Sequence, residues 1–134
     1  MLARRGMALI LVLVMSAFIG MSAMLLFATT NMETMIAGNI RRMNQAKISA
    51  ASGLNHFTAL RLNYNTLRRR AGGLQTLQII PATQLSARTS YEVKVLFSPA
   101  LSEGQYMVKS TGYYSKGDKV LSSHPIKALF QGRQ

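Results

Sequence analysis

Residues 7–27 read MALILVLVMSAFIGMSAMLLF, a run without a single charged side chain. At about 1.5 Å of rise per residue, a helix of this length measures roughly 31 Å, enough to cross the ~30 Å hydrocarbon core of a bilayer. Arg4 and Arg5 precede the run, and flanking charges of this sign favour the cytoplasmic side of a membrane. The sequence therefore predicts one membrane-spanning helix over residues 7–30.

The first six residues, MLARRG, admit three interpretations. A cleaved secretory signal has an apolar run of only ~7–15 residues, so the run here is too long for one. A plain membrane anchor fits the length and would stay uncleaved. In the third interpretation residues 1–6 are a leader, which ends at Gly6 and is removed before Met7. Such a cut would take away the basic residues that hold the chain at the cytoplasmic face.

The 134-residue chain as a whole is strongly basic, with 16 Lys and Arg against four acids and a net charge of +12. This charge predicts either an acidic partner, such as nucleic acid, lipid headgroups or an acidic protein, or simply a solvated basic surface. The arginines of residues 68–70 would also be favoured at a helix C-terminus by the helix dipole alone. The candidates for nucleic-acid contact are Arg61, Arg68, Arg69, Arg70 and Arg88, with Tyr113 and Tyr114 beside Lys109 and Lys116 as stacking neighbours.

The residues of the chain do not support thiol chemistry, metal binding or catalysis. The chain has no cysteine, and its two histidines, His56 and His124, are far apart in sequence. The four acids are scattered, and there is no glycine-rich phosphate loop. We therefore expect no enzymatic activity, no metal site and no cofactor.

After Thr30 the apolar residues recur at spacings of three and four, which predicts an amphipathic helix over residues 31–71. Gly38 and Gly53 interrupt this pattern, and residues 71–73 (AGG) are expected to end the helix. One side of the helix would then pack against the rest of the chain. The apolar stripe consists of Met32, Met35, Ile36, Ile40, Met43, Ala50, Leu54, Phe57, Leu60, Tyr64 and Leu67.

Residues 72–134 change to an alternation of period two, which is typical of β-strands. We expect four or five short antiparallel strands, with a turn at 116–119 (KGDK) and with Pro81 and Pro125 marking a strand end and a break or edge. A long helix packed on a small antiparallel sheet makes the predicted fold class α+β. The predicted strands are residues 76–80, 90–97, 105–115, 120–123 and 126–130.

Three segments together resemble the N-terminal region of the PilX-type minor pilins of type IV pili. They are residues 6–10 (GMALI), 33–39 (ETMIAGN) and 46–54 (AKISAASGL). That family shows a Gly-x-Ala-Leu start, a Met-Ala-Gly-Asn-like segment and an Ala-Ala-Glu-Ala-Gly-like segment, and Ala51 stands here where the last has its glutamate. The resemblance covers roughly residues 4–57 and does not extend to the C-terminal half.

The resemblance implies a type IV pilin-like fold. It also implies that the chain is processed, stored in the membrane and then assembled into a pilus. Residues 1–6 would be a prepilin leader cut between Gly6 and Met7 by a prepilin peptidase, and Met7 would then be N-methylated. The chain would be stored as a single-pass inner-membrane protein with its C-terminal domain in the periplasm, and incorporated into an extracellular pilus, or fimbrium. Its partners would be other minor pilins and the major pilin, and its function would be to prime or assemble a type IV pilus or related pseudopilus.

Leu11 is an informative difference from the major pilins. They carry a glutamate as the fifth residue of the mature chain, thought to neutralise the terminal amine of a neighbouring subunit, and Leu11 occupies that place here. A position at the tip rather than in the shaft would follow, although sequence drift alone also explains the leucine. Two other functions remain open at this stage: a pilus-associated DNA-binding receptor, and a simple single-pass membrane protein with an uncleaved anchor. Whether the system is a pilus, a competence system or a secretion pseudopilus also stays open.

Overall fold

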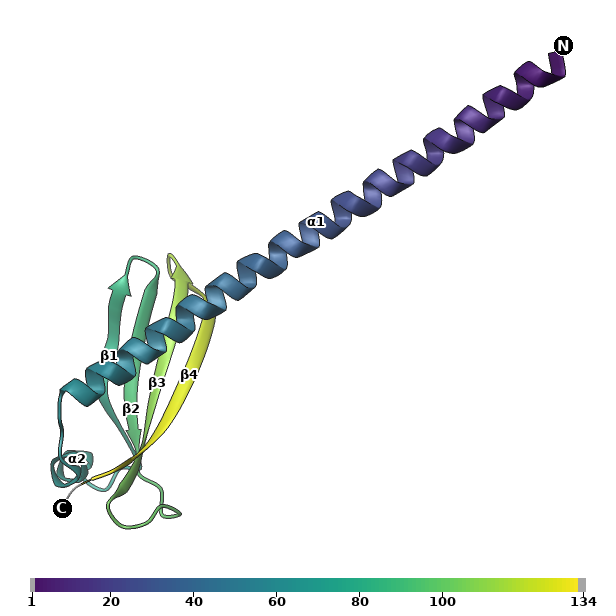
Figure 1. Ribbon diagram of the computed structural model, residues 1–134. Helices are drawn as coiled ribbons and strands as arrows, with labels where there is room; N and C mark the ends of the chain where they lie inside the picture. The colour runs from purple at the N-terminus through teal and green to yellow at the C-terminus, as the bar shows by residue number, and fades with distance from the viewer. Residues whose placement is uncertain (1, 133–134) are drawn as a thin grey trace. The chain divides into compact units, whose positions relative to one another are not determined.

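The computed structural model describes residues 2–132 of the chain, with side chains from Gly6 onward. It divides into two compact units, Met1–Asn39 and Ile40–Gln134, which are described separately below. The elements follow in the order α1 (Leu2–Ala59), α2 (Tyr64–Ala71), β1 (Thr76–Ser86), β2 (Thr89–Leu96), β3 (Gln105–Lys116) and β4 (Lys119–Gln131) (Figure 1). One long helix thus precedes a short helix and four strands, and the α+β class predicted from the sequence is confirmed.

The unit Met1–Asn39 consists of the N-terminal part of α1 alone. No proline interrupts the helix, and its serine and threonine hydroxyls bond back to the helix itself. The hydroxyl of Ser16 donates to the carbonyl oxygen of Leu13 at 2.9 Å, and that of Ser22 donates to the carbonyl oxygen of Phe18 at 2.9 Å. The hydroxyl of Thr30 likewise donates to Leu26 at 2.8 Å. These polar groups therefore need no water, which suits a helix in an apolar surrounding.

The predicted helix over residues 31–71 does not run unbroken. α1 ends at Ala59, the backbone of Arg61 takes a left-handed conformation (φ 44°), and α2 begins after Asn63, which is extended. The amide of Leu60 donates to the carbonyl oxygens of both His56 and Phe57, so the last turn of α1 tightens before the chain bends. The end of α2 is as expected, with Gly72 left-handed (φ 56°) at its C-terminus.

The four strands form one antiparallel sheet in the order β1-β2-β3-β4. The expected turn at residues 116–119 joins β3 to β4, with Gly117 at φ 61°. The strand end predicted at Pro81 is wrong, because β1 continues through it. Of the two alternatives at Pro125, the break is wrong and the edge is right, because β4 continues through Pro125 and is an edge strand. β1 and β4 are the two edges of the sheet, where a residue without an amide donor is tolerated. The two segments predicted at 120–123 and 126–130 are therefore a single strand.

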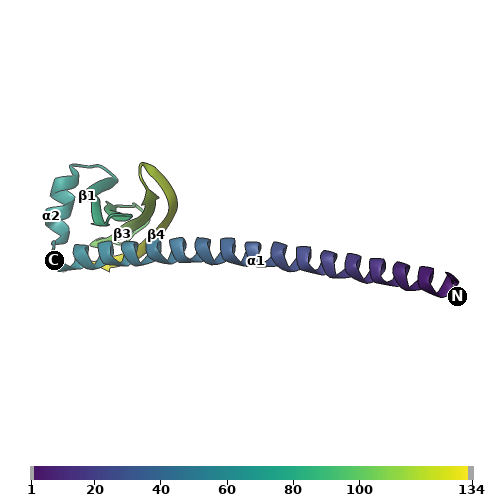
Figure 2. The same ribbon diagram turned by 90° about the horizontal axis from the view of Figure 1, so that it is seen from above.

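Residues 40–59 of α1 lie along one face of this sheet, which we call the covered face (Figure 2). Phe57 anchors the core there, with ring centroids 6.4 Å from Tyr106 and 5.6 Å from Phe130. The fully buried Leu67 brings α2 into the same core. The buried cluster consists of Phe57, Leu67, Ile80, Tyr91, Val93, Val95, Tyr106 and Val108.

The stripe predicted for the amphipathic helix is only partly buried. Ala50, Phe57 and Leu67 are buried as expected, and Leu54 and Tyr64 are half-buried. The larger residues at the N-terminal end of the stripe and Leu60 are exposed, so the prediction is wrong for them. The exposed members are Met32, Met35, Ile36, Ile40, Met43 and Leu60.

Candidate functional site

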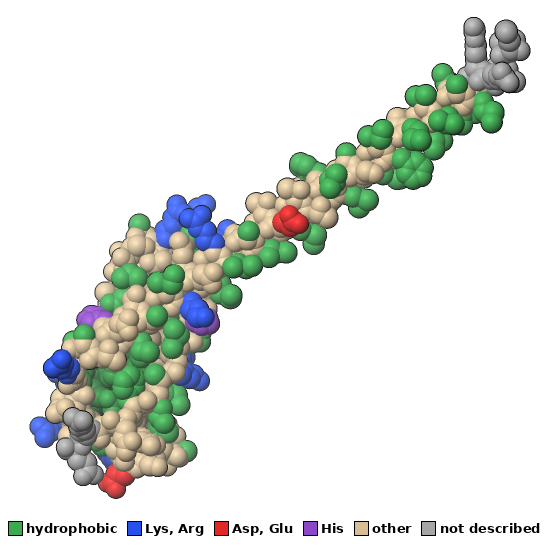
Figure 3. Space-filling model, viewed as in Figure 1, with side chains coloured by type: hydrophobic (Ala, Val, Ile, Leu, Met, Phe, Trp, Pro, Cys, Tyr) green, Lys and Arg blue, Asp and Glu red, His purple; other side chains and the backbone are tan. Residues whose placement is uncertain are grey.

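The first candidate site is the apolar helix over residues 7–30. Its large side chains are all exposed, from Met24 at 79% to Val14 at 49%, and Figure 3 shows them along this part of α1. A helix that is apolar all round belongs either in a large protein core or in a membrane. Nothing in the unit Met1–Asn39 covers these side chains, so the helix is a candidate membrane span near the N-terminus. The chain therefore has the composition of a single-pass membrane anchor.

The predicted processing residues lie within α1. Gly6 and Met7 are both helical and exposed, and a Cβ added at Gly6 would meet no atom within 4 Å. Leu11 is 60% exposed on the same helix. The side chains of Arg4 and Arg5 lie outside the part of the chain whose side chains the structure describes. Among the side chains that the structure describes, none covers Gly6 or Met7.

The second feature is the contact between α1 and the covered face, which is built from small residues. Ala46, Ser49 and Ala50 are fully buried, although none of them is large. The Ser110 hydroxyl on β3 donates to the carbonyl oxygen of Ala50 at 2.7 Å, and the Ser49 hydroxyl donates to that of Ser90 at 2.9 Å. These two bonds join the helix backbone and side chains directly to the sheet.

Two glycines make this close approach possible. A Cβ at Gly112 on β3 would meet the backbone of Ala46 and Ala50 in α1. A Cβ at Gly53 on α1 would meet the Ser110 hydroxyl and lie 2.8 Å from Cδ2 of Tyr91. Such distances leave no room for a methyl group, so both positions require glycine for packing rather than for backbone conformation. We call the contact around Gly53 and Gly112 the glycine seam.

The arginines suggested for nucleic-acid contact do not form one surface. Arg61 lies between the helices and residues 68–70 are exposed on α2, near the start of β1. Arg88 lies at the turn between β1 and β2, at the opposite end of β1 (Figure 1). Its guanidinium contacts the Tyr114 hydroxyl at 3.5 Å, whereas that of Arg68 donates to the Tyr64 hydroxyl at 2.7 Å. The structure thus separates these candidates into two groups.

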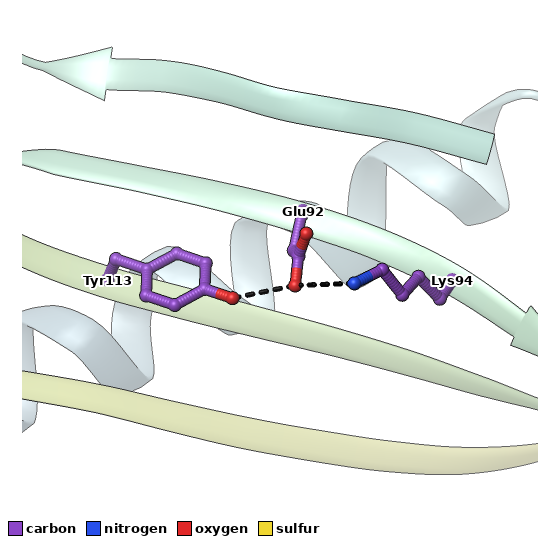
Figure 4. A network of polar contacts seen from close by, with 3 residues as sticks. All are labelled: Glu92, Lys94 and Tyr113. Atoms are coloured by element: carbon purple, nitrogen blue, oxygen red, sulfur yellow. Dashed lines mark hydrogen bonds and ion pairs between the residues drawn. The ribbon is translucent and has the colours of Figure 1, made fainter. Parts of the chain in front are cut away.

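A polar network lies on the sheet face away from α1, which we call the open face (Figure 4). One carboxylate oxygen of Glu92 accepts the Tyr113 hydroxyl at 2.6 Å and the Lys94 ammonium at 3.1 Å. The hydrogen bond from Tyr113, assisted by Lys94, lowers the pKa of Glu92 although burial opposes the shift. Burial, and then the bond to Glu92, raises the pKa of Tyr113 to about 12. The network therefore keeps a carboxylate and a neutral phenol together at neutral pH.

The acidic and histidine side chains of residues 6–132 are spread apart. No three His, Asp or Glu side chains among them lie close enough to share a metal ion. An open depression between α2 and the loop after β2 is lined by Tyr64, Arg68 and Glu103, among others. Every buried side-chain nitrogen or oxygen in the described part of the chain has a hydrogen-bond partner.

The sequence did not lead us to the glycine seam or to the Glu92 network. Gly53 interrupts a helical pattern, which indicates curvature or the close approach of another helix rather than of a strand, and Gly112 lies inside a strand that alternates well without it. A glycine in the middle of a strand is itself a signal that another backbone approaches closely. Comparison of the chain with protein-family models, with curated protein sequences and with solved structures finds no match. Its function therefore has to be argued from its own residues.

Proposed function

We propose that this protein is a minor pilin, which takes part in priming or assembling a type IV pilus or a related pseudopilus. One observation carries the proposal. α1 is a single helix from Leu2 to Ala59, whose exposed apolar part over residues 7–30 is continuous with a part that packs on the sheet through the glycine seam. The sequence resemblance over residues 4–57 supports the same function.

The continuity of α1 supplies a mechanism for storage and assembly. While the helix lies in a bilayer, residues 7–30 satisfy their backbone groups internally and place apolar side chains in the lipid. Cleavage between Gly6 and Met7 would remove the basic leader and leave a new amine at the tip of an apolar helix. The helix could then move from lipid into a bundle of other apolar helices, because both surroundings cover the same side chains.

The basic C-terminal domain is compatible with export to the periplasm. Long domains are translocated largely regardless of their charge, so only charges close to the span influence its orientation. Arg4 and Arg5 are the basic residues directly before the span, and residues 28–40 after it contain no Lys or Arg. This asymmetry favours a cytoplasmic N-terminus and a periplasmic domain.

Leu11 favours a place in a small initiating complex, at the tip. It carries no carboxylate for the amine of a neighbouring subunit, and a carboxylate in hydrocarbon is costly unless it is paired. The Met7 amine of this chain can still meet a glutamate supplied by another pilin. The protein would then join a filament in few copies, next to pilins that carry the glutamate.

Complementation of a deletion strain tests the proposal. Wild-type protein should restore filament formation in the native host, whereas Gly6→Leu should accumulate in the membrane with its leader and restore none. Gly20→Leu is the matched control, because a Cβ at either glycine meets no atom within 4 Å. We expect Gly20→Leu to be cleaved as wild type is. Normal filaments in the deletion strain, or in the presence of uncleaved Gly6→Leu, would contradict the proposal.

A further inference from the structure

The open face of the sheet carries three lysines in one row. In the strand register Lys94 on β2 is directly opposite Lys109 on β3, and Lys109 is directly opposite Lys127 on β4. Lys94 and Lys109 are half-buried, and Lys127 is exposed. Adjacent strands lie about 4.8 Å apart, so the row repeats positive charge at that spacing across three strands. We call these residues the lysine row.

The lysine row is costly for the isolated chain. Like charges directly opposite each other on neighbouring strands destabilise a sheet. Glu92 forms an ion pair with Lys94 and also attracts Lys109 at longer range. No carboxylate among the described residues lies within ion-pair distance of Lys109 or Lys127. Lysines on an edge strand can serve to prevent edge-to-edge aggregation, which would account for Lys127 on β4. That reason does not apply to β2 and β3, which are the central strands.

A row of apolar side chains runs beside the lysine row. Leu96 pairs with Met107, and Met107 pairs with Leu129, one step along the same face of the strands. Leu96 and Met107 are half-buried, and Leu129 is 58% exposed. Residues two apart in a strand are about 6.7 Å apart, so the two rows are parallel and adjacent. A partner that fits this face must offer acidic groups and apolar groups side by side.

We propose that the open face binds an amphipathic α-helix of another protein, with an acidic row beside an apolar row. Helix residues three or four apart recur about every 5 Å along the axis, which matches the spacing of the lysine row. The inference does not depend on the pilin proposal, because it rests on the sheet register alone.

The composition of the chain excludes a second copy of itself as this partner. The whole sequence has four acids, Glu33, Glu92, Glu103 and Asp118, and Glu33 is the only acid in either helix. Neither α1 nor α2 can therefore present an acidic row. Two copies would also repel each other, since each has a net charge of +12.

The face suits an acidic protein better than nucleic acid. A phosphate backbone has no apolar surface to place against Leu96, Met107 and Leu129. The Glu92 carboxylate at one end of the lysine row, which accepts the Tyr113 hydroxyl, would repel a phosphate and an acidic side chain alike. The apolar row is therefore what distinguishes the two partners. Nucleic acid and anionic lipid are therefore alternatives that the experiment must separate from the helix.

The experiment uses the full chain in non-ionic detergent micelles and a synthetic helical peptide. The peptide carries Glu at helix positions i, i+4 and i+7 and Leu at i+1, i+5 and i+8, and its control has Gln in place of each Glu. Binding is followed by the methyl signal of Met107, assigned with Met107→Leu. The methyl signals of Met15 and Met24, on residues 7–30, serve as an internal reference. We expect the Glu peptide to shift the Met107 signal and the Gln peptide to bind at least about tenfold more weakly.

Matched variants of the chain locate the charges that matter. Changing Lys94, Lys109 and Lys127 together to Gln should weaken binding of the Glu peptide about tenfold. Changing Lys47, Lys116 and Lys119 to Gln removes the same charge from exposed positions elsewhere and should leave the affinity unchanged. The single change Lys127→Gln, on an exposed residue of the edge strand, should weaken binding about twofold to threefold without affecting the fold.

Several results would overturn the inference. An equal loss of affinity in both triple variants would show that the peptide is held only by the general positive charge of the chain. An unmoved Met107 signal would place the peptide elsewhere. A single-stranded DNA oligonucleotide or phosphatidylglycerol vesicles could bind more tightly than the Glu peptide. If that binding depended on the lysine row, the face would be assigned to a phosphate ligand instead.

Discussion

The two ends of α1 differ in a way that hydrophobicity alone does not predict. Residues 7–30 carry large apolar side chains and leave them exposed, whereas Ala46, Ser49, Ala50 and Gly53 are small and fully or almost fully enclosed. The first end has no partner within its own unit, which is why lipid or other helices are expected to cover it. The second end approaches β3 so closely that only small residues fit. Burial over residues 46–53 therefore follows the size of the side chains rather than their hydrophobicity, whereas the large Phe57 is buried further along the same helix.

The largest effect is expected from Gly112→Ala. Its Cβ would meet backbone atoms of Ala46 and Ala50, which cannot rotate away, so residues 46–57 of α1 would have to move off the sheet. We expect the free energy of unfolding of the domain to fall by about 3 kcal/mol. Thermal unfolding of the full chain in mild detergent, followed by near-UV circular dichroism, measures this change. An unaltered melting temperature would show that α1 does not approach β3 so closely.

The same substitution at two glycines of α1 gives the sharpest comparison of its ends. Ala is a better helix former than Gly by about 1 kcal/mol, and at Gly38 its methyl group meets no atom within 4 Å. At Gly53 the methyl group must displace the Ser110 hydroxyl and the ring of Tyr91. We therefore expect Gly38→Ala to be neutral or stabilising, and Gly53→Ala to be about 2 kcal/mol less stable than Gly38→Ala. Equal stability of the two variants would show that a methyl group fits at Gly53 and that the glycine seam does not require glycine there.

A smaller effect is expected from pH on the open face. The folded pKa of Glu92 lies below its ordinary value of 4.5, so this group stabilises the fold above pH 4.5 and loses that contribution as the pH falls through the folded pKa. The folded pKa of Tyr113 is about 12 against an ordinary 10.0, so its contribution is present below pH 10.0 and is lost as the pH rises towards 12.

Tyr113→Phe isolates this contribution, because it removes the hydroxyl that bonds to Glu92. The melting temperature of wild type should exceed that of Tyr113→Phe at neutral pH, by an amount that corresponds to about 1 kcal/mol. The difference should shrink at both acid and alkaline pH. Tyr114→Phe is the control, since its hydroxyl makes only a 3.5 Å contact with Arg88. If the difference in melting temperature between wild type and Tyr113→Phe stayed constant across the pH range, the bond between Tyr113 and Glu92 would not be its cause.

Much of the fold could be predicted from the sequence, since the apolar run of residues 7–27 and the alternation in 90–97 are unambiguous patterns. The break between α1 and α2 could not, because Phe57, Leu60, Tyr64 and Leu67 keep helical spacing across it. Leu67 is buried from a separate helix, and Leu60 falls in the bend. Periodicity records which residues are apolar and not whether the chain turns between them.

The two surfaces of the sheet were harder to predict for different reasons. The glycine seam depends on how closely two backbones approach, and a hydrophobic pattern gives weight to Met35 or Ile40 rather than to Gly112. The lysine row depends on the register of three strands, which brings Lys94, Lys109 and Lys127 together from separate parts of the chain. Neither is encoded in local sequence.

The intact mass of the protein isolated from membranes and filaments of its native host distinguishes a processed pilin from a simple membrane anchor. We expect a mature chain that begins at Met7, with the added mass of one methyl group on its amine. We also expect few copies of this chain relative to the major pilin in the filament fraction. A chain that retains residues 1–6 in every fraction would contradict the account and leave a simple membrane anchor in its place.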